Sequence, residues 1–111
     1  MAIRITPNPK FTAKVPFTVA GEADPVLIPF EFRHKSPEAL KVFFAEHRQS
    51  PTAEALSEVV VRWVDKVVDE EGVAVPFTPD NFRAFLEGHG PRAEDILRAY
   101  VRELTESRQK N

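Results

Sequence analysis

Three histidines and one acidic run are the residues of this chain whose types could do chemistry. The histidines are His34, His47 and His89, and none has an acid or a second histidine at the spacing of a metal site such as HExxH. The run Asp69-Glu70-Glu71-Gly72 carries acids that could attract a divalent cation, but it lacks the oxygen ligands at every second position of an EF-hand loop. We therefore interpret the histidines as ordinary surface or boundary residues and the acidic run as a solvated turn.

Nucleophiles and phosphate-binding loops find no better support in the sequence. The chain has no cysteine, and no serine lies in a nucleophile-elbow context. Gly88-His89-Gly90 neither follows an expected strand nor precedes the lysine and hydroxyl of a phosphate loop. The sequence therefore predicts no catalytic residue, no cofactor and no metal, and we expect a protein that is not an enzyme.

Length and composition narrow the class of protein. With 111 residues the chain fits one domain, 1–111, and its net charge of -2 argues against a nucleic-acid partner that depends on phosphate neutralisation. The N-terminus lacks the apolar run of a signal peptide, and no apolar segment approaches the roughly 18 residues that span a membrane. We expect a soluble protein of the cytoplasm with no nucleic-acid or membrane partner, and a mobile arm at residues 1–10.

The elements expected to position the remaining side chains are those of an α+β fold. Strict alternation of apolar and polar residues predicts a β-hairpin with strands at about 11–19 and 26–33. Pro16 and Pro29 lie on its polar face, where they could blunt the strand edges or leave an edge open to another subunit.

Helix-start residues precede three of the helices that the spacing predicts. Each offers a hydroxyl that can cap the helix, mostly with proline at the first helical position: Ser36-Pro37 for the first, Ser50-Pro51 or Thr52 for the second, and Thr78-Pro79 for the third. Helices are predicted at about 37–48, 52–66, 79–88 and 92–107. A short strand at 73–77, where apolar residues alternate after the acidic turn, would follow the second helix.

Aromatic side chains are numerous for a chain of this size, with nine phenylalanines, one tryptophan and one tyrosine. We interpret four as core anchors, because they lie on the apolar faces of expected elements: Trp63, Phe77, Phe82 and Tyr100. Surplus apolar surface would indicate a protein partner. The first place to look for it is the junction of hairpin and first helix, where four phenylalanines cluster: Phe30, Phe32, Phe43 and Phe44.

The order of these features resembles a known family. Three features follow one another from Val59 to Glu87, in VVVRWVDKVVDEEGVAVPFTPDNFRAFLE: a segment with the tryptophan, an acidic turn that contains glycine, and a VPF segment. IPFEFRHKSPEAL, from Ile28 to Leu40, precedes them, and a helix with Ala99-Tyr100 and the ending SRQKN follows. Over most of its length the chain is similar to the tail assembly chaperones of long-tailed (siphovirus-type) bacteriophages and of prophages, although Arg62 stands where the family pattern has glycine before the tryptophan.

The resemblance implies a non-enzymatic role in virion morphogenesis within the cytoplasm of the bacterial host. Such a protein would bind and solubilise the helical tape-measure protein, help to recruit tail-tube protein subunits, self-associate, and be absent from the mature virion. Many weak apolar contacts along one long helix would supply the avidity.

Two other hypotheses stay open on the sequence alone. One is a small bacterial adaptor or regulatory domain that binds one folded partner at fixed stoichiometry. The other is an enzyme subunit whose site is completed by oligomerisation, although no titratable residues cluster in the sequence.

Overall fold

A three-stranded antiparallel sheet forms the centre of the molecule. The computed structural model describes residues 9–49, 51–88 and 91–105. Strands β1 (Lys10–Phe17) and β2 (Val26–Arg33) pair over their full length as the predicted hairpin, and β3 (Val60–Trp63) pairs with β2, so that the strand order is β1-β2-β3. The α+β class and the N-terminal hairpin are thus confirmed.

The predicted arm at residues 1–10 lies outside the described part of the chain except for its last two residues. Those two are not loose. Lys10 begins β1, and the carbonyl of Pro9 accepts a hydrogen bond from the backbone N–H of His34 at 2.9 Å.

This hydrogen bond also explains the two prolines of the hairpin. Because Pro9 and His34 are a hydrogen-bonded pair and such pairs alternate along an antiparallel ladder, the odd-numbered residues of β1 point their backbone N–H and C=O groups toward β2. The even-numbered residues, including Pro16, point these groups to the open edge of the sheet. In β2, Pro29 faces β3, and its carbonyl accepts from the N–H of Val64 at 2.8 Å. Pro16 therefore removes no ladder hydrogen bond, and at the edge strand it offers no donor to a further strand.

Four helices accompany the sheet, and three of them begin at the predicted caps. They are α1 (Pro37–His47), α2 (Ala53–Leu56), α3 (Pro79–Leu86) and α4 (Arg92–Thr105). The hydroxyl oxygens of Ser36, Thr52 and Thr78 accept from backbone N–H groups three residues ahead, at 3.2, 3.1 and 3.0 Å. The end of the last predicted helix, residues 106–107, lies outside the described residues.

The predicted helix at 52–66 is wrong for most of its length. Only residues 53–56 are helical, and 60–63 form β3 instead. The pairing of β2 with β3 slips by one residue between Phe30↔Trp63 and Phe32↔Val60, so that β3 contains one extra residue. Because of this bulge, Val60 and Trp63 point into the core although they are three residues apart, a spacing that is also typical of a helix.

The segment between β3 and α3 forms a projecting hairpin-like arm, residues 64–78, which we call the acidic arm. The predicted strand at 73–77 is absent; this part of the arm has one isolated bridge, Val68↔Ala74, and a bond from the N–H of Val75 to the carbonyl of Val67 at 2.9 Å. Gly72 closes the tip with a φ of 81°, in the region that favours glycine.

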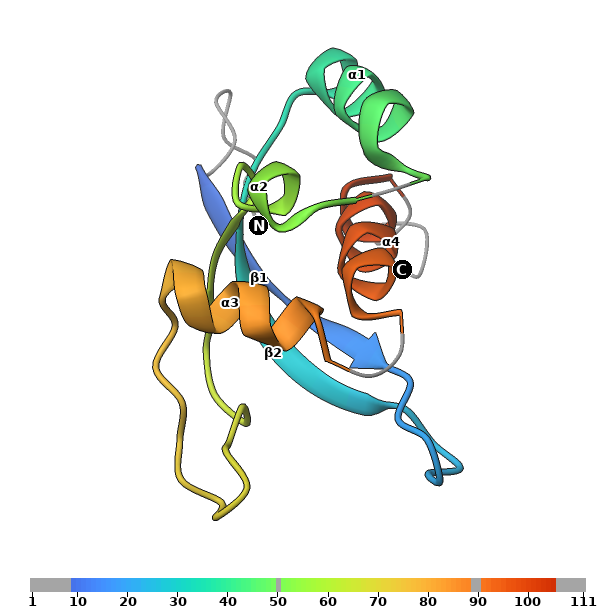
Figure 1. The fold of residues 1–111 in the computed structure, drawn as a ribbon. Coiled ribbons are helices and arrows are strands. Elements are labelled where there is room, and N and C mark those ends of the chain that lie inside the picture. The colour runs from blue at the N-terminus through green and yellow to red at the C-terminus, as the bar shows by residue number, and fades with distance from the viewer. Residues whose placement is uncertain (1–8, 50, 89–90, 106–111) are drawn as a thin grey trace, which may run out of the picture.

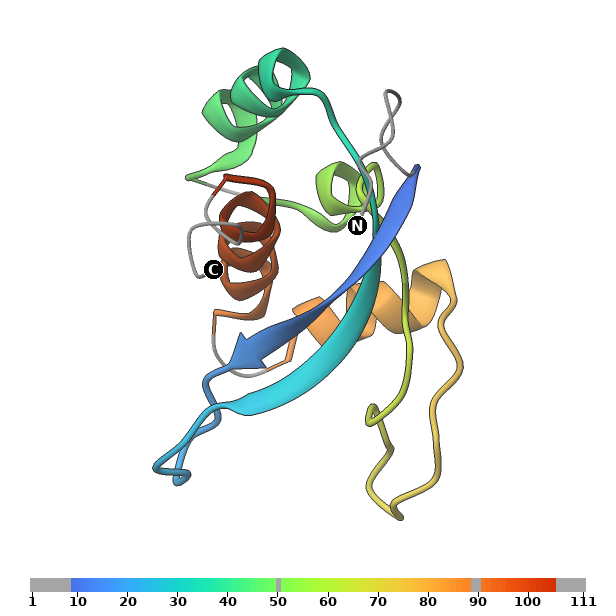
Figure 2. The same cartoon turned by 180° about the vertical axis from the view of Figure 1, so that it is seen from behind.

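The helices lie on one side of the sheet (Figure 1), and the opposite face of the hairpin is uncovered when seen from behind (Figure 2). Helix α4 packs along β1, α3 crosses the sheet below it, and α1 lies beyond the end of the sheet, beside α4. The core between the layers is built from the inward side of each strand and the apolar stripes of α3 and α4; its largest fully buried side chains are Tyr100, Phe30, Phe32, Phe82, Leu56 and Ile96.

Candidate functional site

Three of the four phenylalanines that the sequence grouped as a contact surface are buried in the core. Phe30 and Phe32 are fully buried, and Phe43 is only 4% exposed. Phe32 and Phe43 both pack on the ring of Tyr100, with centroids 5.2 and 6.4 Å away. A contact surface at this junction can therefore include only Phe44, which is half-buried.

The predicted core anchors lie around the sheet's inner face. Trp63, Phe82 and Tyr100 are buried, and the half-buried Phe77 stands edge-on to Trp63 with ring centroids 4.9 Å apart. The hydroxyl of Tyr100 donates to the backbone carbonyl of Arg33 at 2.7 Å, and burial raises the pKa of this tyrosine well above its usual range. This bond ties α4 to the end of β2.

Two of the three histidines lie beside phenylalanine rings. His34 stands edge-on to Phe11, and His47 lies 4.8 Å from the Phe43 ring; His89 is outside the described residues. Among residues 9–49, 51–88 and 91–105, no three acidic or histidine side chains converge so that they could hold a metal ion. No helix in the same ranges is both long and apolar enough to cross a membrane.

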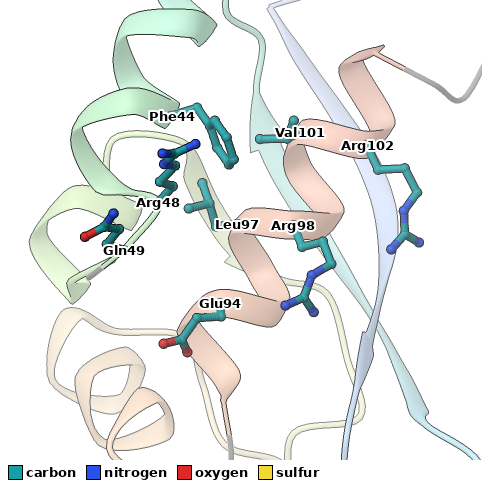
Figure 3. A pocket seen from close by; sticks show the side chains of 8 residues that line it. All are labelled: Phe44, Arg48, Gln49, Glu94, Leu97, Arg98, Val101 and Arg102. Carbon is teal, nitrogen blue, oxygen red and sulfur yellow. The ribbon is translucent and has the colours of Figure 1, made fainter.

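A groove lies between α1 and α4. It has a volume of about 550 Å³. Its floor is apolar, and the side chains of Phe44, Leu97 and Val101 face one another across the gap between the helices (Figure 3). The remaining lining is polar: Arg48, Gln49, Glu94, Arg98 and Arg102.

Each wall of the groove is fixed by core packing. On α1, Phe43 turns inward and leaves the adjacent Phe44 at the groove, because neighbouring residues lie about 100° apart around a helix. On α4, Leu97 and Val101 are one helical turn apart, and Tyr100 on the inward side of the same helix anchors it to the sheet. Leu97 is thus covered, whereas Val101 and Phe44 stay half-buried at the groove.

Positive charge dominates the edges of the groove. Arg98 is paired with Asp95 at 3.2 Å, whereas the guanidinium groups of Arg48 and Arg102 form no ion pair with a described residue. Arg98 and Arg102 extend from α4 on the side away from α1, and Arg48 stands beside Phe44 (Figure 3). An apolar floor with guanidinium groups beside it suits an amphipathic helix whose apolar stripe is flanked by carboxylates.

Sequence reasoning did not identify this groove as a site. By their spacing, Leu97 and Val101 belong to the apolar stripe of the last helix, which predicts burial, and Arg98 and Arg102 belong to its polar face. The available signal was the width of that stripe, which exceeds what one face of a short helix needs for contact with a small sheet.

Comparison with known proteins supplies the family. A family model described as phage tail assembly chaperone matches residues 1–111. Comparisons with curated proteins and with solved structures found no match. Because the family model covers the chain from its first residue to its last, the chain belongs to the phage tail assembly chaperones.

Proposed function

We propose that this chaperone binds the helical tape-measure protein in the groove between α1 and α4 and keeps it soluble without catalysing a reaction. The observation that carries the proposal is the apolar floor of the groove, where the half-buried Phe44 and Val101 flank the buried Leu97 between two helices. A third helix laid into such a groove would bury apolar side chains on both partners, which is the main favourable term in helix-in-groove binding.

The weakness of each contact is useful in this role. One groove covers only a few turns of a partner helix, so each copy binds weakly, and many copies along a tape-measure protein would be held by their number and their mutual contacts. Copies that bind weakly can also be displaced. Displacement by tail-tube subunits, which the chaperone would help to recruit in the host cytoplasm, would leave it absent from the mature virion.

Co-expression with the tape-measure protein of the same phage or prophage tests the proposal. Val101→Glu places a charge on the groove floor, and Val42→Glu is the matched control because Val42 is on α1, 59% exposed and outside the groove. The wild type and Val42→Glu should keep the tape-measure protein in the soluble fraction, whereas Val101→Glu should leave it in the pellet. Phe44→Ala should weaken solubilisation in the same direction without adding charge.

Circular dichroism and thermal melting establish that each variant is folded before its chaperone activity is compared. A folded Val101→Glu protein that solubilises the tape-measure protein as well as the wild type does would contradict the proposed binding site. A tape-measure protein that stays insoluble beside the wild type would contradict the function itself.

A further inference from the structure

The acidic arm is an ordered projection. The indole N–H of Trp63 donates to the carbonyl of Val75 at 2.9 Å at its base, and the N–H of Asp69 donates to the carbonyl of Val73 at 2.9 Å near its tip. The Oδ1 atom of Asp69 also accepts from the backbone N–H groups of Glu71 and Val73, at 2.9 and 3.0 Å. These bonds hold the tip in one conformation, pointing away from the body of the molecule (Figure 1).

The tip presents apolar and acidic side chains together. Val68 and Val73 are 54% and 59% exposed, among the highest values for large apolar side chains in the described residues. The neighbouring Glu70 and Glu71 are exposed, and their carboxylates form no ion pair with a described residue. Packing within one copy gives the two valines no cover, so they are available for a contact with another molecule.

The groove between α1 and α4 has the complementary chemistry. Its floor is apolar, and Arg48 and Arg102 both line it, Arg48 beside Phe44 and Arg102 with its side chain extending from α4 away from α1; neither guanidinium forms an ion pair with a described residue. Two valines beside two glutamates thus match an apolar floor beside two unpaired arginines. The tip presents the same combination, apolar side chains with adjacent carboxylates, that the groove would select in a partner helix.

We propose that, in the absence of the tape-measure protein, the groove of one copy receives the acidic arm of a second copy, and that a client helix must displace this arm. The arm cannot enter its own groove, because the two lie at opposite ends of the molecule (Figure 1). A contact between two different surfaces is heterologous, so it joins copies head to tail into chains or rings. The displacement by a client rests on the proposed function, whereas the contact between copies does not.

A charge exchange tests the contact between copies. The arm variant carries Glu70→Lys and Glu71→Lys, the groove variant carries Arg48→Glu and Arg102→Glu, and size-exclusion chromatography with light scattering measures the mass of each. The wild type should form species larger than a monomer, whose mass rises with protein concentration and falls with added salt because the paired charges are exposed. Each variant alone should be a monomer.

Mixing the two variants in equal amounts provides the decisive comparison. The reversed arm then faces a reversed groove, and the wild-type arm faces a wild-type groove, so assembly should return. A control with Glu22→Lys and Glu58→Lys makes the same change in net charge as the arm variant, at exposed positions outside the arm and the groove, and it should assemble like the wild type. A monomeric wild type, variants that assemble as the wild type does, or a mixture that stays monomeric would each overturn the inference.

Client binding separates this inference from the proposed function. A tape-measure fragment titrated against the arm variant should bind several-fold more tightly than against the wild type, because no arm competes for the groove. Equal affinity for both proteins would overturn the displacement and leave the proposed function standing. Charge-dependent assembly with no client binding would support the contact between copies and refute the proposed function.

Discussion

Replacing Trp63 by alanine should remove a large buried aromatic side chain from the inner face of the sheet. The indole is 4% exposed, and its ring lies 4.9 Å from Phe77, 5.4 Å from Phe85 and 6.3 Å from Phe30, measured between ring centroids. Truncation of a large buried aromatic side chain to alanine lowers the free energy of unfolding by about 3 to 5 kcal/mol, because transfer energy is lost and a cavity remains. For a domain of about 100 residues, this corresponds to a fall in Tm of roughly 12 to 40 °C.

Urea unfolding followed by far-UV circular dichroism measures the loss without relying on tryptophan fluorescence. Trp63→Phe is the informative companion, because it keeps an aromatic ring but leaves the carbonyl of Val75 without its indole donor. It should lose about 1 to 3 kcal/mol, and the amide of Val75 at the base of the acidic arm should exchange with solvent faster. A Trp63→Ala protein with the unfolding midpoint of the wild type would refute the assignment of this residue to the core.

Three further substitutions probe the contacts that hold the layers together. Tyr100→Phe should lower the free energy of unfolding by about 1 to 3 kcal/mol at pH 7, because the backbone carbonyl of Arg33 loses its hydrogen-bond donor. Burial raises the pKa of Tyr100 in the folded state only, so the tyrosine of the unfolded chain ionises first. Above about pH 10 the wild type should therefore lose stability relative to this variant. Asp95→Ala should destabilise the protein by about 1 to 3 kcal/mol in thermal melts, because the buried carboxylate accepts a hydrogen bond from the N–H of Thr18 at 3.3 Å. Arg98, the exposed partner of Asp95 in their ion pair, contributes less, so Arg98→Ala should change stability by less than about 1 kcal/mol. Gly72→Ala should lower the free energy of unfolding in urea by about 1 to 2 kcal/mol. The cause is the positive φ alone, since no atom lies within 4 Å of the added Cβ. An unchanged unfolding midpoint would mean that the tip of the acidic arm is free to adopt another turn.

The hairpin and the helix starts could be predicted from the sequence because each depends on local patterns. Alternation over eight residues specifies which face of β1 and β2 is buried. A hydroxyl followed by proline specifies a helix start at Ser36 and Thr78, and Thr52 caps α2 through its hydroxyl. These signals need no knowledge of what the element packs against.

The third strand could not be predicted in this way, because its pattern is set by a partner strand. Val60 and Trp63 share a face only through the bulge opposite Glu31 and Phe32, and without the pairing their spacing fits a helix equally well. The run of β-branched residues from Val59 to Val61 favoured a strand, but the apolar positions before and after it extended the helical spacing. Tertiary pairing with the free edge of β2 decided the outcome.

The candidate site was only partly visible in the sequence for a related reason. The number of phenylalanines indicated a partner surface, but Phe30, Phe32 and Phe43 find cover in the core once Tyr100 packs against them. The groove depends on where α1 lies relative to α4, two elements separated along the chain by α2, β3 and α3. Phe44 is the one residue of the predicted surface that lines it.

Site-specific photo-crosslinking tests the central claim of tape-measure binding most directly. A photoreactive amino acid is placed at position 101 in the groove or at position 42 on the exposed part of α1, and each protein is co-expressed with the tape-measure protein and irradiated. Mass spectrometry then identifies the crosslinked residues. Crosslinks from position 101 to apolar stripes of the tape-measure protein, with few from position 42, are the predicted result; crosslinks from position 42 and none from position 101 would contradict it.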